Sequence, residues 1–157
     1  MPSPSQYINR IEYVDRNIKK QTENLTHEDS MRQLPFPGNC MNWNIGHILV
    51  YRDEYLGAID GLSAPDAAEF AIYGGGSEPL TDGAKAIPLE ILIERLDASS
   101  ARLKAAFQSL TSEKLNIPYE SWAGNTLDDH LHFYIVVHEA MHLGQLEILR
   151  ELALAEK

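Results

Sequence analysis

The chain has 157 residues, 44% of them hydrophobic and 23% charged, which is typical of a globular protein and excludes a disordered or low-complexity chain. This length fits a single domain, residues 1–157, with a core large enough to need no disulfide or structural metal. The formal charge of -10, from 23 acidic and 13 basic side chains, repels phosphate backbones and anionic lipids, so neither nucleic acid nor a membrane is an expected partner.

The first part of the chain predicts two amphipathic helices. Between Gln6 and about Leu25, apolar residues recur at the three-and-four spacing of a helix, and a second run with this spacing extends from about residue 42 to 59. The segment "HEDSMRQLPFPGN" between them contains two prolines and a glycine, which interrupt the helical pattern.

Residues 60–87 are predicted to form a long connection after the second helix. Glycine and proline recur throughout this segment, three consecutive glycines stand at 74–76, and only "PDAAEFAIY" is suited to a short helix. Connections of this length in compact domains are usually functional. The segment is therefore a candidate cover for a site.

A third helix is predicted from about Pro88 to Leu110, and a last helix from Thr126 to about Leu154. Thr126 and Asp129 have the spacing of a helix cap. No segment alternates apolar and polar residues in the manner of a strand. The fold class predicted is therefore all-α, a four-helix bundle with a long connection between helices two and three.

The last helix contains "HEAMH" at residues 138–142, which is the H-E-x-x-H pattern of metallopeptidases. His138 and His142 lie one turn apart and face the bundle interior. Only 15 residues follow His142, too few for another helix, and the extended peptidase motif would need glycine and histidine where the chain has Gln145 and Ile148. A peptidase is therefore not expected.

Helix two supplies a third histidine, His47, within "NWNIGHILVYRDEY". Bundle cores build metal sites from side chains on facing helices, and catalytic zinc sites commonly use three protein ligands and one open position. His47, His138 and His142 could therefore hold one ion. Alternatively, each is a core histidine that bonds to a carbonyl or a carboxylate.

The segment from Trp43 to Leu49, followed late in the chain by His138, His142 and Gln145, resembles the DinB-like superfamily of metal-binding four-helix bundles. The resemblance implies that His47, His138 and His142 are metal ligands. Relatives in that superfamily include bacillithiol-dependent transferases and a mycothiol-dependent maleylpyruvate isomerase. The family name implies no DNA binding, in agreement with the acidic charge.

Three functions follow as hypotheses, and all three share the histidines. In the first, one divalent ion, Zn²⁺ or Ni²⁺, activates a low-molecular-weight thiol for transfer to an electrophile. In the second, the ion activates water for hydrolysis, and Glu139 or Glu54 accepts the proton. In the third, the bundle is a non-catalytic metal-binding or interaction module.

Several other residues are assigned by their positions on the helices. Gln145, Tyr51 and Tyr134 each stand about one turn from a proposed ligand, where they could hydrogen-bond a ligand or a substrate. Glu139 is either a catalytic base or an ordinary solvated or salt-bridged glutamate, and the second role is favoured. The remaining histidines, at positions 27, 130 and 132, are placed outside the site.

A cytoplasmic location is expected. No early segment resembles a signal peptide, and no apolar run approaches the ~20 residues of a membrane span. The single cysteine, Cys40, forms no internal disulfide, as is usual in a reducing compartment. A small-molecule substrate is expected, and the resemblance suggests a homodimer.

Overall fold

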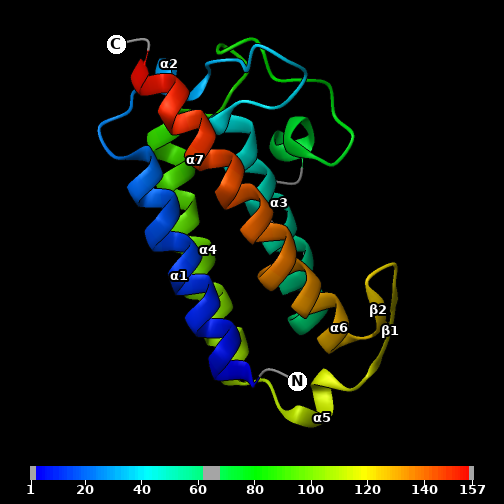
Figure 1. Ribbon diagram of the computed structural model, residues 1–157. Helices are drawn as coiled ribbons and strands as arrows, with labels where there is room; N and C mark the ends of the chain where they lie inside the picture. Colours follow the sequence, from blue (N-terminus) through cyan, green and yellow to red (C-terminus); the bar gives the residue numbers. More distant parts are fainter. Residues whose placement is uncertain (1–2, 62–67, 156–157) are drawn as a thin grey trace.

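Four helical rods run lengthwise through the molecule in the computed structural model, which describes residues 3–61 and 68–155 (Figure 1). They are α1 (Pro4–Thr22), α3 (Met41–Asp60), α4 (Leu89–Gln108) and a fourth rod composed of α6 (Leu127–His132), a π-helical segment η2 (Phe133–His138) and α7 (Glu139–Ala155). The predicted all-α bundle is confirmed. No helix among the described residues is long and apolar enough to cross a bilayer.

The long connection between α3 and α4 lets these two helices run in the same direction, whereas α1 and α7 run the opposite way (Figure 1). The short helix predicted in this connection is the 3-10 helix η1 (Glu69–Tyr73); its predicted start at residues 65–67 lies outside the described residues. Gly61 ends α3 with φ 75, and its N–H donates to the Gly57 carbonyl. A left-handed cap of this kind favours glycine.

Two short helices, α2 (His27–Ser30) and α5 (Ser112–Leu115), and one β-hairpin were not predicted. The hairpin pairs β1 (Pro118–Ser121) antiparallel with β2 (Gly124–Thr126). The expectation of no strand was wrong because strands of three and four residues are too short to display a readable alternation. The hairpin leads directly into α6, where the predicted cap forms: Asp129 N–H donates to Thr126 Oγ1 at 3.1 Å.

The last rod was predicted as one regular helix, and this was wrong at its centre. Between Phe133 and His138 the backbone is π-helical, and the Glu139 N–H donates to the Tyr134 carbonyl, five residues earlier. A π-helical turn adds one residue to the turn, so side chains before and after it are rotated relative to a regular helix. His138 stands at the end of this turn and His142 in the regular helix beyond it.

The core has two apolar clusters, one toward each end of the bundle. A buried polar layer lies between them, about midway along the rods. One cluster contains Ile18, Ile48, Leu92 and Leu146, and the other contains Ile11, Leu56, Leu103 and Ile135, with further members in each. The intervening layer consists of Asp15, Arg52, Ser100 and Glu139, one residue from each rod. Since their side chains bond to one another, the layer ties all four rods together.

Candidate metal centre

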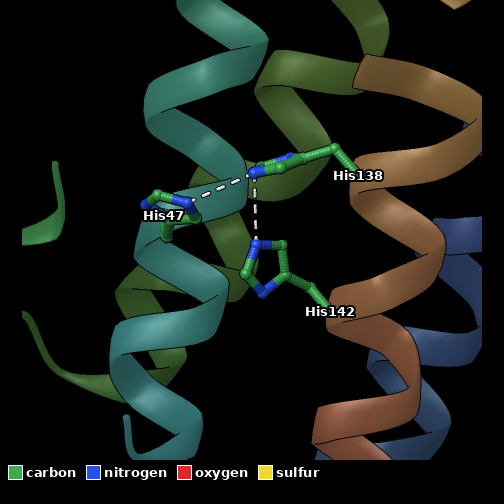
Figure 2. Close-up of side chains that lie close together, drawn as sticks. All are labelled: His47, His138 and His142. Atoms are coloured by element: carbon green, nitrogen blue, oxygen red, sulfur yellow. Dashed lines mark hydrogen bonds between the residues drawn. The ribbon is translucent and has the colours of Figure 1, made fainter. Parts of the chain in front are cut away.

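The three histidines predicted as ligands meet between α3 and the last rod (Figure 2). His138 lies in the middle, with its Nε2 atom 3.3 Å from Nε2 of His47 and 3.2 Å from Nε2 of His142. All three side chains are buried, and one ring nitrogen of each lies within 4.8 Å of the other two. Residues about ninety positions apart in the sequence thus form one cluster.

The spacing of the nitrogens suits a single ion. Nitrogens bound at about 2.0–2.1 Å with tetrahedral angles lie about 3.3 Å apart. Two of the three Nε2 separations, 3.3 and 3.2 Å, agree with this value. Three imidazole donors suit Zn²⁺, Ni²⁺, Cu²⁺ or Fe²⁺. These residues therefore have the chemistry and the spacing to hold a divalent metal ion.

The second ring nitrogens of two histidines are anchored to oxygen acceptors. Nδ1 of His47 lies 2.7 Å from the carbonyl oxygen of Tyr73, in the connection between α3 and α4. Nδ1 of His142 lies 2.8 Å from Oδ1 of Asn44 and 2.7 Å from Oε1 of Gln145. Because these acceptors require an N–H, Nδ1 carries the proton in both rings and Nε2 presents its lone pair.

This choice of tautomers leaves the centre in need of a cation. His47 and His142 both direct a lone pair at Nε2 of His138, and the single proton that a neutral His138 could place there cannot serve both fully. Nδ1 of His138 is buried and has no hydrogen-bond partner among the described residues. An ion at the centre would satisfy all three lone pairs at once.

Burial keeps the three rings neutral at physiological pH. Desolvation, with the neighbouring His142 and His47, lowers the pKa of His138 to about 3. Desolvation, with His47, lowers the pKa of His142 to about 4, and desolvation also lowers the pKa of His47. Since only neutral imidazole binds metal, the site can accept an ion without first losing protons.

The connection between α3 and α4 is fitted closely against His47. The Trp43 ring stacks on the His47 ring with centroids 4.3 Å apart, and its Nε1 donates to the Ile72 carbonyl at 3.1 Å. The Tyr73 ring packs on Gly46, where a Cβ atom would lie only 2.3 Å from it. A glycine at 46 is therefore what allows the Tyr73 carbonyl to approach His47.

Tyr51 and Tyr134 lie next to the histidines, as their helical positions predicted. The Tyr51 ring centroid is 4.6 Å from that of His138, and the two tyrosine rings stack at 4.9 Å. A Cβ on Gly75 would be 2.8 Å from the Tyr51 hydroxyl and 4.0 Å from His47 Cε1. The glycine-rich part of the connection therefore lies over this side of the centre.

Glu54 is exposed and stands near the two tyrosine hydroxyls. Desolvation raises the pKa of its carboxyl group. Burial, followed by the Glu54 charge, raises the pKa of Tyr51. Burial also raises the pKa of Tyr134; the hydrogen bond from Trp122 lowers it, and the Glu54 charge raises it. The two phenols therefore stay protonated and can act as hydrogen-bond donors.

Glu139 is buried and salt-bridged, which is the role that the sequence favoured. Its two oxygens each accept an N–H of Arg52 at 2.9 Å, and Oε1 also accepts the Tyr55 hydroxyl at 2.7 Å. Arg52 is itself fully buried. Both carboxylate oxygens are therefore engaged in the polar layer of the core.

The other three histidines lie outside the cluster, as predicted. His132 is exposed, and His27 bonds to the Gly83 carbonyl at 3.3 Å. His130 is buried against the rings of Tyr119 and Tyr134. The sequence interpretation missed Asn44 and the Tyr73 carbonyl. Asn44 could have been found as a polar amide one turn before His47 on a buried helix face, whereas nothing in the sequence points to a backbone carbonyl.

The fold and the cluster together define a four-helix bundle with a candidate three-histidine metal site. The model of the DinB superfamily matches residues 10–146, and the chain belongs to that superfamily. A crystal structure of a conserved protein from Enterococcus faecalis is similar over 99% of both chains, with a TM-score of 0.75 and 17% sequence identity, which shows the shared fold. No curated protein sequence matches the chain.

Proposed function

We propose that this protein is a metal-dependent enzyme that activates a low-molecular-weight thiol and transfers it to a small electrophile. The observation that carries the proposal is the convergence of three Nε2 atoms, with the rings of His47 and His142 held by oxygen acceptors at Nδ1. A divalent ion held there would lower the pKa of a thiol or water molecule beside it, which is the chemistry common to transfer and hydrolysis. Membership of the DinB superfamily supports the thiol as cosubstrate.

The chain's own groups have defined parts in this reaction. The three histidines would hold the ion, and an ion with three protein ligands would still be able to bind a thiol. The rings of Tyr51 and Tyr134 lie beside the His138 ring, and their hydroxyls can donate to a leaving group. As the sulfur bonds to the electrophilic carbon, the leaving group departs with the bonding electrons, and the thiol proton passes to Glu54 or to solvent.

Hydrolysis is the second candidate, and it depends on Glu54. Of the two bases considered for it, Glu139 is engaged by Arg52 and Tyr55, while Glu54 is exposed and has a raised pKa. A raised pKa brings a carboxyl group closer to the range used in acid–base catalysis. Under this proposal Glu54→Gln abolishes ester hydrolysis while metal binding persists.

The first experiment measures metal. The metal content of purified, untagged wild-type protein is measured by inductively coupled plasma mass spectrometry. The variants His47→Ala and His132→Ala are measured in the same way, the second as a control at an exposed histidine. We expect close to one Zn²⁺ or Ni²⁺ per chain in the wild type and in the control, and almost none in His47→Ala. If the wild-type protein is purified without metal and takes up no ion on titration, both enzymatic proposals are contradicted. A non-catalytic interaction module would then be the remaining hypothesis.

The second experiment measures transfer. Metal-loaded protein is mixed with bacillithiol or mycothiol and chlorodinitrobenzene, and the thioether is followed with chloride release. We expect turnover that is lost in His47→Ala and kept in His132→Ala. Hydrolysis of an activated ester without thiol consumption would instead support the second candidate.

A cytoplasmic location and a homodimer are further proposals, the first supported by the single cysteine and the second by the family resemblance. The dimer contact would use exposed apolar side chains of α7, where Met141 is 55% and Ile148 59% exposed. Sedimentation velocity of the wild type and of Met141→Glu tests the dimer. A wild-type monomer at all concentrations would exclude it.

A further inference from the structure

A second concave site lies between α1 and the start of the last rod, and it shares no residue with the metal centre. The groove has a volume of about 690 Å³. This is within the range of small-molecule sites. Its lining residues are Gln6, Tyr7, Asn9, Arg10, Tyr13 and Arg16 from α1, and His132 and Val136 from the last rod.

The charge of this groove is opposite to that of the protein. Acidic side chains outnumber basic ones by 23 to 13 in the chain, yet the groove is lined by two arginines, one histidine and no carboxylate. The acidic residues of α1 are engaged elsewhere: Glu12 pairs with Lys104, and Asp15 with Arg52. The groove is therefore a local cationic surface on an anionic molecule.

Neither arginine has an ion-pair partner among residues 3–61 and 68–155. This distinguishes them from Arg32, Arg52, Arg95 and Arg102, which all pair with carboxylates. Both Arg10 and Arg16 are exposed, so their guanidinium groups are available to a ligand from solution. Guanidinium groups bind carboxylate and phosphate through paired N–H donors.

The helix spaces these groups regularly along the groove. Arg10 and Arg16 are six residues apart, which corresponds to about 9 Å along the axis of α1. Tyr13 lies midway and is 51% exposed, so its ring offers an apolar surface between the two charges. Tyr7 forms part of the wall of the groove. Its hydroxyl already donates to Asp128 Oδ1 at 2.9 Å, so it is not available to a ligand. The amides of Gln6 and Asn9 add further donors.

We propose that this groove binds a small organic molecule with two anionic groups, carboxylate or phosphate, one at each arginine, and with its carbon skeleton against Tyr13. A small molecule fits the groove better than a macromolecule does. The net charge of -10 repels an extended polyanion, whereas two arginines suffice to neutralise two anionic groups. Binding here is independent of the metal-centred activity.

Isothermal titration calorimetry of the full chain tests this proposal with three probes. Adipate supplies two carboxylates, fructose bisphosphate supplies two phosphates, and hexanoate matches adipate with only one charge. We expect saturable one-site binding of adipate or fructose bisphosphate, and much weaker binding of hexanoate. The stronger of the two dianions identifies the anionic group that the groove prefers.

Three variants locate the binding. Arg10→Ala and Arg16→Ala are each expected to lower the affinity for the dianion about tenfold or more, because each removes charge-assisted hydrogen bonds. Lys20→Ala is the matched control, because Lys20 is exposed on α1 but does not line the groove, and it should change affinity less than about twofold. Circular dichroism verifies that all three variants fold.

The proposal fails if neither dianion gives saturable heat at millimolar concentration. It also fails if Lys20→Ala weakens binding as much as the two groove variants, which would indicate general charge attraction. Loss of metal binding or of thiol transfer in other variants does not affect this outcome, since no metal-centre residue lines the groove.

Discussion

Arg52 and Glu139 form a two-point ion pair in the centre of the bundle, with Nε to Oε1 and Nη2 to Oε2 each at 2.9 Å. Arg52 is fully buried and Glu139 is 1% exposed. Arg52 Nη1 donates both to Asp15 at 2.8 Å and to Ser100 at 2.9 Å, and the Ser100 hydroxyl in turn donates to Asp15. The glutamate that makes the sequence resemble a peptidase is thus part of the layer that joins the four rods, directly after the candidate ligand His138.

Glu139→Gln is predicted to destabilise the fold. The substitution removes one of the two carboxylate charges that pair with buried Arg52. Because Asp15 remains, the loss should not exceed the about 3–5 kcal/mol that breaking a buried pair costs. Urea denaturation should show this loss, while Glu12→Gln, which disrupts the partly exposed pair with Lys104, should cost about 1 kcal/mol or less. Full stability and metal content in Glu139→Gln, with hydrolysis abolished, would instead give the glutamate the catalytic role.

Gly46→Ala is predicted to disturb the metal centre through Tyr73. The added Cβ would lie 2.3 Å from the Tyr73 ring, and the Tyr73 carbonyl holds Nδ1 of His47. We expect a loss of about 1–3 kcal/mol in the free energy of unfolding from overpacking. Metal affinity should fall by about tenfold or more as the carbonyl moves away.

Gly144→Ala is the matched control, because it makes the same change within a helix where the new Cβ meets nothing within 4 Å beyond its chain neighbours and the backbone of its own helix. Alanine favours a helix over glycine by up to about 1 kcal/mol, so this variant should be as stable as the wild type or more so. Equal effects of the two substitutions on competitive zinc titration would contradict the contact between Tyr73 and Gly46 as the cause.

Helix patterning accounts for the part of this molecule that was predicted. Tyr51, His138 and His142 could be placed because each lies on the buried side of a rod, and burial follows the 3.6-residue repeat. Their actual approach to His47 also depends on the π-helical turn before His138, which rotates the helix and has no clear signature in "FYIVVH".

The hydrogen bonds that anchor the histidines could not be predicted from the sequence, for a different reason. Nδ1 of His47 bonds to a backbone carbonyl of Tyr73, a group that every residue possesses and that only the path of the connection brings into place. The partner of Glu139 was similarly hidden, since Arg52 on a helix is ordinarily read as an exposed charge. Pairing across the core is a tertiary property, and periodicity within one helix does not specify it.

Removal of both acceptors at His142 is predicted to weaken metal binding. Asn44 Oδ1 and Gln145 Oε1 share the proton on Nδ1, so Gln145→Ala alone leaves one acceptor and should have a small effect. The double variant Asn44→Ala/Gln145→Ala should lower affinity by about 10–100-fold, as is common for groups that orient a ligating histidine. Additive small effects in a double-mutant cycle would contradict this redundancy.

The metal-free protein is predicted to lose stability as the pH falls from 7 to 5. His138 and His142 have pKa values lowered from 6.5 to about 3 and about 4 in the folded chain. Between these values and 6.5, the unfolded chain binds protons that the folded chain does not, so the free energy of unfolding decreases with decreasing pH. Well below pH 6.5 each such histidine contributes a slope of about 1.4 kcal/mol per pH unit. Urea unfolding after chelation, from pH 7 to 5, measures the slope, and His138→Gln should reduce the slope by about the contribution of one histidine. A slope that is flat in the wild type would show that the rings are already protonated or solvated in the folded chain.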